Sequence, residues 1–155
     1  MQIHLVAVGT RMPAWVAEGF HEYAKRLPAS CRLVLREVPA IKRGKGANLA
    51  RIAREEGLRL LAAVPNGARI VALERAGRTM DTVGVAAELA NHMQNGQDLA
   101  LLVGGPEGLA PEALSRAQAV WSLSALTLAH PVVRVVLAEQ LYRAWSIINE
   151  RPYHR

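Results

Sequence analysis

The sequence predicts an α/β fold in which helices flank a mostly parallel sheet. Short apolar runs of strand length alternate with longer segments of helical periodicity along the whole chain. One run, at residues 99–103, is almost purely apolar, as expected of a strand that is buried on both faces of a sheet. No repeat or long linker interrupts the alternation, so we expect residues 1–155 to form a single domain.

The first third of the chain predicts two strands with a helix between them. Residues 3–8 form an apolar run, and residues 31–38 alternate apolar and polar side chains, which is typical of a half-buried or edge strand. Pro13 opens the intervening helix, and Pro28 stops it. Four residues recur in this helix at helical spacing: Trp15, Val16, Phe20 and Tyr23.

The rest of the chain predicts a basic loop at residues 42–46, followed by alternating helices and strands. Asp81 is suited to cap a helix that ends near Gly96, and Pro131 lies in the first turn of the last helix. The expected elements are, in order, a helix at 48–63, a strand at 69–73, the capped helix, a strand at 99–103, a short helix from 111, a strand at 119–122 and a helix at 131–148.

The composition indicates a globular protein with an anionic partner. Apolar residues make up 51% of the chain, and the net charge of +6 suits a polyanion such as nucleic acid. The single cysteine, Cys31, excludes an internal disulfide framework and a cysteine-based zinc site, and it fits a cytosolic protein. The first residues do not resemble a signal peptide, and polar residues break the most apolar stretch, 119–138. We therefore expect neither a signal peptide nor a membrane span.

Three predicted loops lie at the carboxyl ends of strands, where open parallel sheets bind ligands. They are the residues after Leu73, the glycine turn at 104–108 and the apolar loop at 123–130. The glycine turn has neither a dinucleotide nor a P-loop fingerprint, so it is either a tight strand-to-helix turn or a ligand loop. We expect the apolar loop to be buried, with its backbone groups paired by a ligand such as adenine or covered by another loop or subunit.

Basic residues occur in two further places of interest, the apolar side of the last helix and the tail of the chain. Arg134 falls on the apolar side of the last helix, so it either extends past the helix end or meets an anionic substrate group. The tail, residues 151–155, continues an aromatic and basic stretch of the kind that binds unpaired RNA, although core packing is the alternative for Tyr142 and Trp145. His130 and His154 are candidate general bases.

Six stretches together resemble the RlmH family: LVAVGT, EYAKRLP, KRGKGA, LLVGGPEGL, WSLSALTLAHPVVRVVLAEQLYRAWSI and RPYHR. They cover essentially the whole chain. The family consists of bacterial methyltransferases that modify N3 of a pseudouridine in the RNA of the large ribosomal subunit. The resemblance implies a SPOUT fold, in which the last strands and helix form a deep trefoil knot, and a homodimer whose site is completed across the interface.

The resemblance also implies that S-adenosylmethionine binds in the knot, held mostly by backbone groups and without a metal. Carried over residue by residue, its contacts fall on Leu73, Gly104, Gly105, Leu123, Ser124, Ala125, Leu126, Thr127 and Leu128. N3 of pseudouridine carries a proton that must leave before or during methyl transfer, and a base or a cation would assist its departure. The catalytic candidates are Arg134, Tyr153 and His154, with roles unassigned.

Two other functions stay open on the residues alone. A non-catalytic RNA-binding protein of the ribosome would explain the charge, but it leaves the glycine turn and the apolar loop without a purpose. A nucleotide-dependent oxidoreductase or hydrolase would use the same sheet edge, but the missing phosphate fingerprints disfavour it.

Overall fold

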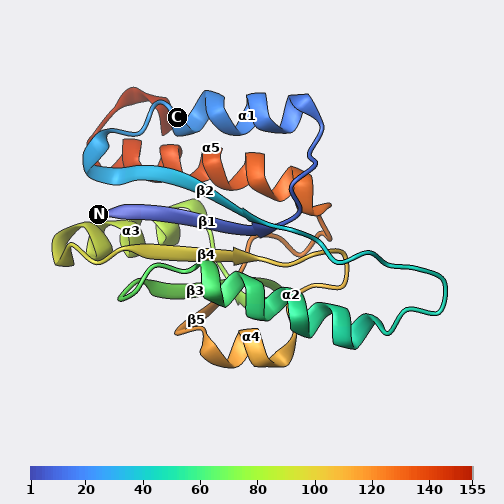
Figure 1. Cartoon of the computed structure of the whole chain (residues 1–155). Coiled ribbons are helices and arrows are strands. Elements are labelled where there is room, and N and C mark those ends of the chain that lie inside the picture. The colour runs from blue at the N-terminus through green and yellow to red at the C-terminus, as the bar shows by residue number, and fades with distance from the viewer. Residues whose placement is uncertain (155) are drawn as a thin grey trace.

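The computed structural model describes residues 1–154 and contains one five-stranded sheet. Its strands are β1 (Gln2–Val8), β2 (Arg32–Val38), β3 (Arg69–Thr79), β4 (Leu99–Val103) and β5 (Ala119–Ser122). They lie in the order β2-β1-β4-β3-β5, and each pairs with its neighbour in parallel (Figure 1). The predicted parallel α/β fold is therefore confirmed.

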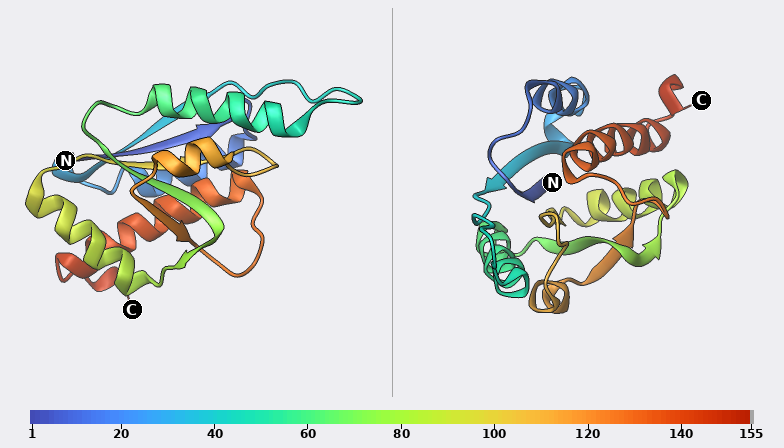
Figure 2. Two further views of the ribbon diagram at one scale, coloured as in Figure 1. Left: turned by 90° about the horizontal axis from the view of Figure 1, so that it is seen from below. Right: turned by 90° about the vertical axis from the view of Figure 1, so that its right-hand side faces the viewer.

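Helices cover both faces of this sheet (Figure 2). One face carries α1 (Ala14–Ala24), α3 (Thr82–Asn95) and α5 (His130–Ile148), and the other carries α2 (Leu49–Ala63) and α4 (Pro111–Arg116). Strand β1 shows why two cores form, because its successive side chains point to opposite faces. Leu5 packs in the core beneath α1, α3 and α5, and Val6 packs in the core beneath α2 and α4.

The predicted cap of α3 at Asp81 is confirmed, and the structure shows a second cap, at Asn48, that was not predicted. The side chain of Asp81 accepts a hydrogen bond of 2.7 Å from the backbone N–H of Gly84 at the start of α3. Asn48 accepts one of 3.1 Å from the N–H of Arg51 at the start of α2. Both contacts satisfy backbone donors that a helix cannot pair internally. Helix α3 ends at Gly96, which adopts a left-handed conformation.

The largest difference from the prediction is in β3, and the bounds of other elements differ by a residue. Strand β3 continues to Thr79 instead of ending at Leu73, and its pairing with β5 shifts register between Leu73 and Arg78. The extension is polar and partly exposed, so it lacks the apolar run that marks a strand. Helix α5 begins at His130, one residue early. Trp15 is 55% exposed and stays outside the core.

No helix within residues 1–154 is long and apolar enough to cross a membrane. The single-domain assignment and the trefoil knot stay predictions.

Candidate functional site

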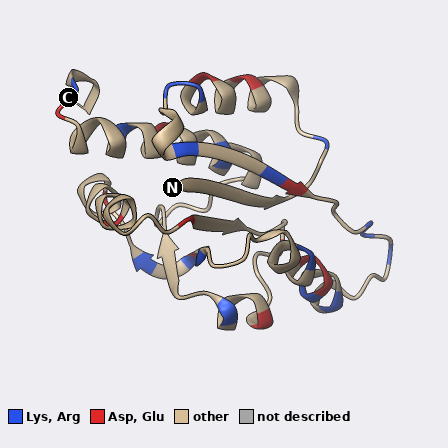
Figure 3. Cartoon of the chain, turned by 60° about the vertical axis from the view of Figure 1, so that its left-hand side comes forward, with Lys and Arg blue, Asp and Glu red and all other residues tan. Residues whose placement is uncertain are grey.

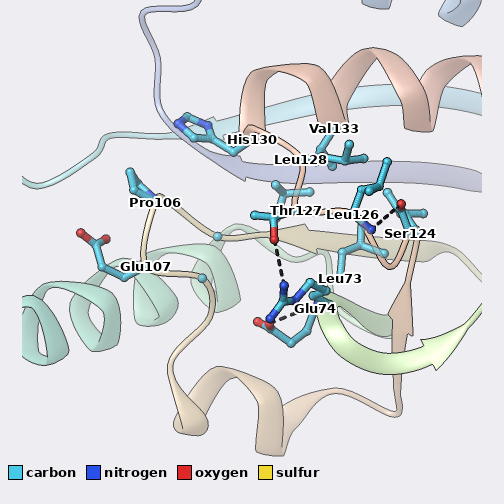
Figure 4. A pocket seen from close by; sticks show the side chains of 16 residues that line it. Leu73, Glu74, Pro106, Glu107, Ser124, Leu126, Thr127, Leu128, His130 and Val133 are labelled. Atoms are coloured by element: carbon cyan, nitrogen blue, oxygen red, sulfur yellow. Dashed lines mark hydrogen bonds between the residues drawn. The ribbon is translucent and has the colours of Figure 1, made fainter.

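A cavity of about 360 Å³ lies at the carboxyl ends of β4 and β5 and beside the middle of β3, where the pairing of β3 with β5 shifts register (Figure 4). This volume is within the size range of small-molecule sites. The three segments that were singled out in the sequence meet there, but the residues after Leu73 belong to β3 and do not form the predicted loop. β3 contributes Leu73, Glu74 and Arg75, and the glycine turn follows β4. Five residues of the apolar loop form a further wall: Leu123, Ser124, Leu126, Thr127 and Leu128. His130 and Val133, at the start of α5, complete the lining.

The structure brings eight of the nine predicted cofactor contacts to this one cavity. The exception is Ala125, which lies in the apolar loop but is exposed and does not line the cavity. Segments that are far apart in the sequence, such as Arg75 and Thr127 at a separation of 52 residues, meet because their strands are parallel neighbours. The cavity therefore follows from the sheet topology.

The glycine turn needs glycine for close backbone approach more than for unusual dihedral angles. A Cβ atom at Gly104 would lie 2.6 Å from the backbone carbon and oxygen of Gly108. Of the three glycines, only Gly108 has a positive φ, +77°. Its N–H donates to the carbonyl of Gly105 at 2.9 Å, which closes the turn. A side chain at position 104 would force this turn to change shape.

An ion-pair cluster that the sequence analysis missed lies behind the glycine turn. Arg43 donates to Glu56 on α2 at 2.6 Å and to Glu107 in the turn at 2.9 Å. Glu56 is 2% exposed, so it has almost no access to water. The hydrogen bonds from Arg43 lower the pKa of Glu107 below its usual value. The spacing of Glu56 with Ile52 and Leu60 on the buried side of α2 is the signal that could have revealed it.

The apolar loop is exposed, so the expectation that it is buried was wrong for the single chain. Leu126 is 73% exposed because the loop forms the outer wall of an open cavity. Local side chains pair part of its backbone, since the N–H of Leu126 donates to the hydroxyl of Ser124 at 2.9 Å. Arg75 donates to the hydroxyl of Thr127 at 3.0 Å and joins the loop to β3 (Figure 4). Cover by a ligand or by a second subunit stays a prediction.

Arg134 lies on the buried face of α5, as expected, but the alternative that it extends past the helix end was wrong, because its partners lie at the carboxyl ends of β1 and β2. Its guanidinium donates to the carboxylate of Glu37 at 2.6 Å and to the carbonyl of Gly9 at 2.8 Å. The side chain is 1% exposed and does not line the cavity. Within the chain it holds the start of α5 against the ends of β1 and β2. Its predicted part in catalysis stays a prediction, and these contacts favour an indirect one.

Replacing Arg134 with alanine should lower the free energy of unfolding by about 3 kcal/mol, because the change removes a buried guanidinium that pairs with the partly exposed Glu37 and leaves the carbonyl of Gly9 without its donor. For a chain of this size the melting temperature should fall by about 10 °C. Urea unfolding of the variant would measure the loss. Arg54→Ala, at an exposed position of α2, is the control and should stay within about 0.5 kcal/mol of the unchanged protein. An equally small effect of Arg134→Ala would contradict this role.

His130 is the titratable imidazole of the cavity wall. Its Nδ1 atom is buried and has no hydrogen-bond partner among residues 1–154. Burial lowers the pKa of His130 below its usual value, and the positive charges of Arg134 and Arg43 lower it further. The imidazole is therefore neutral at neutral pH and can accept a proton or a hydrogen bond.

The tail lies at the other end of α5 from the cavity (Figure 1). The hydroxyl of Tyr153 donates to Glu139 at 3.0 Å, and its ring centroid lies 4.6 Å from that of Tyr142. Burial and the hydrogen bond to Glu139 raise the pKa of Tyr153 to about 12. Since α5 has 19 residues, its ends are separated by about 28 Å. The structure therefore does not bring Tyr153 and His154 to the cavity of their own chain.

The aromatic residues that precede the tail serve the core. Tyr142 and Trp145 are partly buried and pack against the larger core, which supports the packing alternative for both. His154 is exposed, and Arg155 lies outside the described residues. Within residues 1–154, no group of three or more His, Cys, Asp or Glu side chains is placed to hold a metal ion.

Comparisons with known proteins agree on one family. A family model described as "Predicted SPOUT methyltransferase" matches residues 1–154. The chain is 58% identical to "Ribosomal RNA large subunit methyltransferase H" of Thioalkalivibrio sulfidiphilus over 155 residues, which cover 100% of this chain and 99% of that one.

Two solved structures share the fold at low sequence identity. A probable methyltransferase from Bordetella pertussis Tohama I has a TM-score of 0.56 at 14% identity, with 92% of this chain and 95% of that one covered. A putative methylase family protein from Neisseria gonorrhoeae has a TM-score of 0.55 at 15% identity, with 90% and 81% covered.

Proposed function

The chain belongs to the SPOUT methyltransferase family, and from this premise we propose that it methylates RNA of the large ribosomal subunit with S-adenosylmethionine as the methyl donor. The observation that carries the proposal is the meeting of the glycine turn, the apolar loop and the middle of β3 around one cavity. The relative with 58% identity carries that substrate in its name, and the net charge of +6 suits it. A ribosomal substrate would place the protein in the cytoplasm.

The cavity fits this methyl donor in size and chemistry. Its apolar wall, with Leu73, Leu128 and Val133, suits the adenine ring. The glycine turn offers backbone groups that no side chain covers, and these suit the polar parts of the donor. We propose the nine residues carried over from the family as its contacts, with Ala125 contributing through its backbone in the bound state.

S-adenosylmethionine supplies a methyl group that is already activated by its sulfonium, so the work of the protein is to orient the acceptor. We propose N3 of a pseudouridine as that acceptor. Its proton needs a base close to the methyl group, and the neutral imidazole of His130 is placed on the cavity wall. Arg134 supports this arrangement indirectly, because it fixes the first turn of the helix that carries His130.

Tyr153 and His154 can take part only in a homodimer, and we propose one. The cavity of the same chain lies about 28 Å from these residues along α5. The tail of a second subunit is not held at this distance, so it can lie beside the cavity. A second subunit would also cover the exposed side chain of Leu126. In this arrangement the tail adds Arg151 and aromatic groups beside the incoming RNA.

We predict that S-adenosylmethionine and S-adenosylhomocysteine bind the isolated protein in the presence of EDTA, with dissociation constants below the millimolar range. The reason is that the proposed contacts are backbone, hydroxyl and apolar groups, none of which needs a metal to bind the ligand. Isothermal titration calorimetry with and without a divalent ion measures both ligands. Absence of binding at millimolar ligand, or strict dependence on the ion, would contradict the proposed function.

A further inference from the structure

The basic loop, residues 42–46, extends from the body of the molecule between β2 and α2 (Figures 1 and 2). Lys42 and Lys45 are exposed, and they are among the basic residues coloured blue in Figure 3. A Cβ atom at Gly44 or Gly46 would meet nothing within 4 Å, so the space around the loop is open. Two cations on an open loop can approach a large anionic surface without rearrangement of the fold.

Arg43, between these lysines, points in the opposite direction and anchors the loop. Besides its bonds to Glu56 and Glu107, its guanidinium donates to the carbonyl of Ile41 at 2.9 Å. The N–H of Ile41 in turn donates to Glu56 at 2.9 Å. A buried carboxylate needs a cationic partner, so Glu56 fixes the place where the loop joins the body.

The same guanidinium supports the glycine turn from behind. Glu107 is part of that turn and lines the cavity, and both of its oxygens accept hydrogen bonds from Arg43. A Cβ atom at Gly105 would lie 2.9 Å from Nη2 of Arg43, so the backbone of the turn rests against the ion pair. The basic loop and the glycine turn therefore share one contact, and a change in the position of either is transmitted to the other.

We propose that the basic loop binds phosphate groups of the substrate RNA, and that Arg43 and Glu107 couple this binding to cofactor binding in the cavity. The proposal rests on the proposed function and adds a binding surface and two positioning residues to it. An RNA that fixes the position of the basic loop also fixes the glycine turn through Arg43. The cofactor then binds with a smaller loss of conformational entropy, and its affinity rises. By reciprocity the cofactor strengthens RNA binding by the same factor.

The phosphate contact is tested with the double variant Lys42→Gln/Lys45→Gln. Binding to large ribosomal subunits that lack the methyl group is measured at several salt concentrations. Loss of two phosphate contacts should reduce the slope of log affinity against log salt by about 1.5. The control is Arg32→Gln/Arg116→Gln, which removes the same charge from exposed positions near the amino ends of β2 and β5 and should keep the slope of the unchanged protein. Equal slopes for the two double variants would overturn the phosphate contact.

The coupling is tested with Glu107→Gln, which preserves the shape of the side chain and the Arg43–Glu56 pair but removes the charge that faces Arg43. The affinity for S-adenosylhomocysteine is measured with and without saturating ribosomal subunits. We expect saturating subunits to raise the affinity for S-adenosylhomocysteine about tenfold in the unchanged protein and less than about twofold in the variant. Glu112→Gln, at an exposed carboxylate of α4, is the control and should keep the tenfold effect. An undiminished effect in Glu107→Gln would overturn the coupling.

The unchanged protein separates these outcomes from the proposed function. If it binds neither S-adenosylhomocysteine nor the subunits, the proposed function fails, and the coupling fails with it. If it binds both ligands and transfers the methyl group, while Glu107→Gln and the lysine variant behave like their controls, the function stands and the further inference alone is overturned.

Discussion

Replacing Gly104 with alanine is expected to lower the affinity for S-adenosylmethionine about 100-fold, with most of the fold retained. The new Cβ atom would lie 2.6 Å from the backbone of Gly108, so one side of the glycine turn must move. A displacement of about 1 Å in a positioning element is enough for an effect of this size. Calorimetric titration of the variant measures the affinity, and circular dichroism measures its unfolding.

Gly96→Ala is a matched control for this prediction. Gly96 has a φ of +66° at the end of α3, and its Cβ would meet nothing within 4 Å. The change should cost about 1 kcal/mol of stability without altering cofactor affinity. If Gly104→Ala binds the cofactor as well as Gly96→Ala does, the glycine turn is only a connection between β4 and α4.

Removing the tail, residues 151–155, is expected to slow methyl transfer in a single turnover by about 100-fold or more and to weaken binding of the ribosomal substrate. The rate should fall because Tyr153 and His154 are proposed to complete the site of a second copy and to hold the incoming RNA there, and a displacement of the acceptor by about 1 Å is enough for an effect of this size. Binding should depend less on salt because Arg151 and Arg155 are proposed phosphate contacts.

Single-turnover rates at saturating substrate, together with binding curves at several salt concentrations, separate the two effects of the truncation. Cofactor affinity is the internal control, since the tail lies at the far end of α5 from the cavity of its own chain. Normal rates and an unchanged salt slope would show that the tail only packs on α5 through Tyr142 and Glu139. The basic loop would then be the remaining candidate for RNA contact.

Much of the fold could be predicted from the sequence because its signals are local. The apolar run of β4 and the capping side chain of Asp81 each predict an element from neighbouring residues alone, and the structure contains both. The extension of β3 could not be predicted in this way. Its polar residues are held by pairing with β5, and that pairing depends on a chain segment more than forty residues away.

The candidate site shows the same limit. Its three segments could be brought together from the sequence, because parallel strands bring their carboxyl ends to one side of the sheet, although the segment after Leu73 is part of β3 and not a loop. The partners of Arg134 and Arg43 could not be identified, since periodicity shows that a charged side chain is on a buried face but not what it meets there. Glu56 carried the same signal as Arg134, a charge at a buried helix position. Such a residue predicts an ion pair before any partner is known.

The most direct measurement is methyl transfer to ribosomal RNA. Purified protein is incubated with labelled S-adenosylmethionine and with large subunits or whole ribosomes from cells that lack the modification, and the RNA is digested and analysed by mass spectrometry. We predict one methyl group per large-subunit RNA, on N3 of a pseudouridine, and no methylation of small-subunit RNA. A protein that binds the cofactor but leaves large-subunit RNA unmethylated, or places the methyl group on another kind of nucleotide, would contradict the proposed substrate.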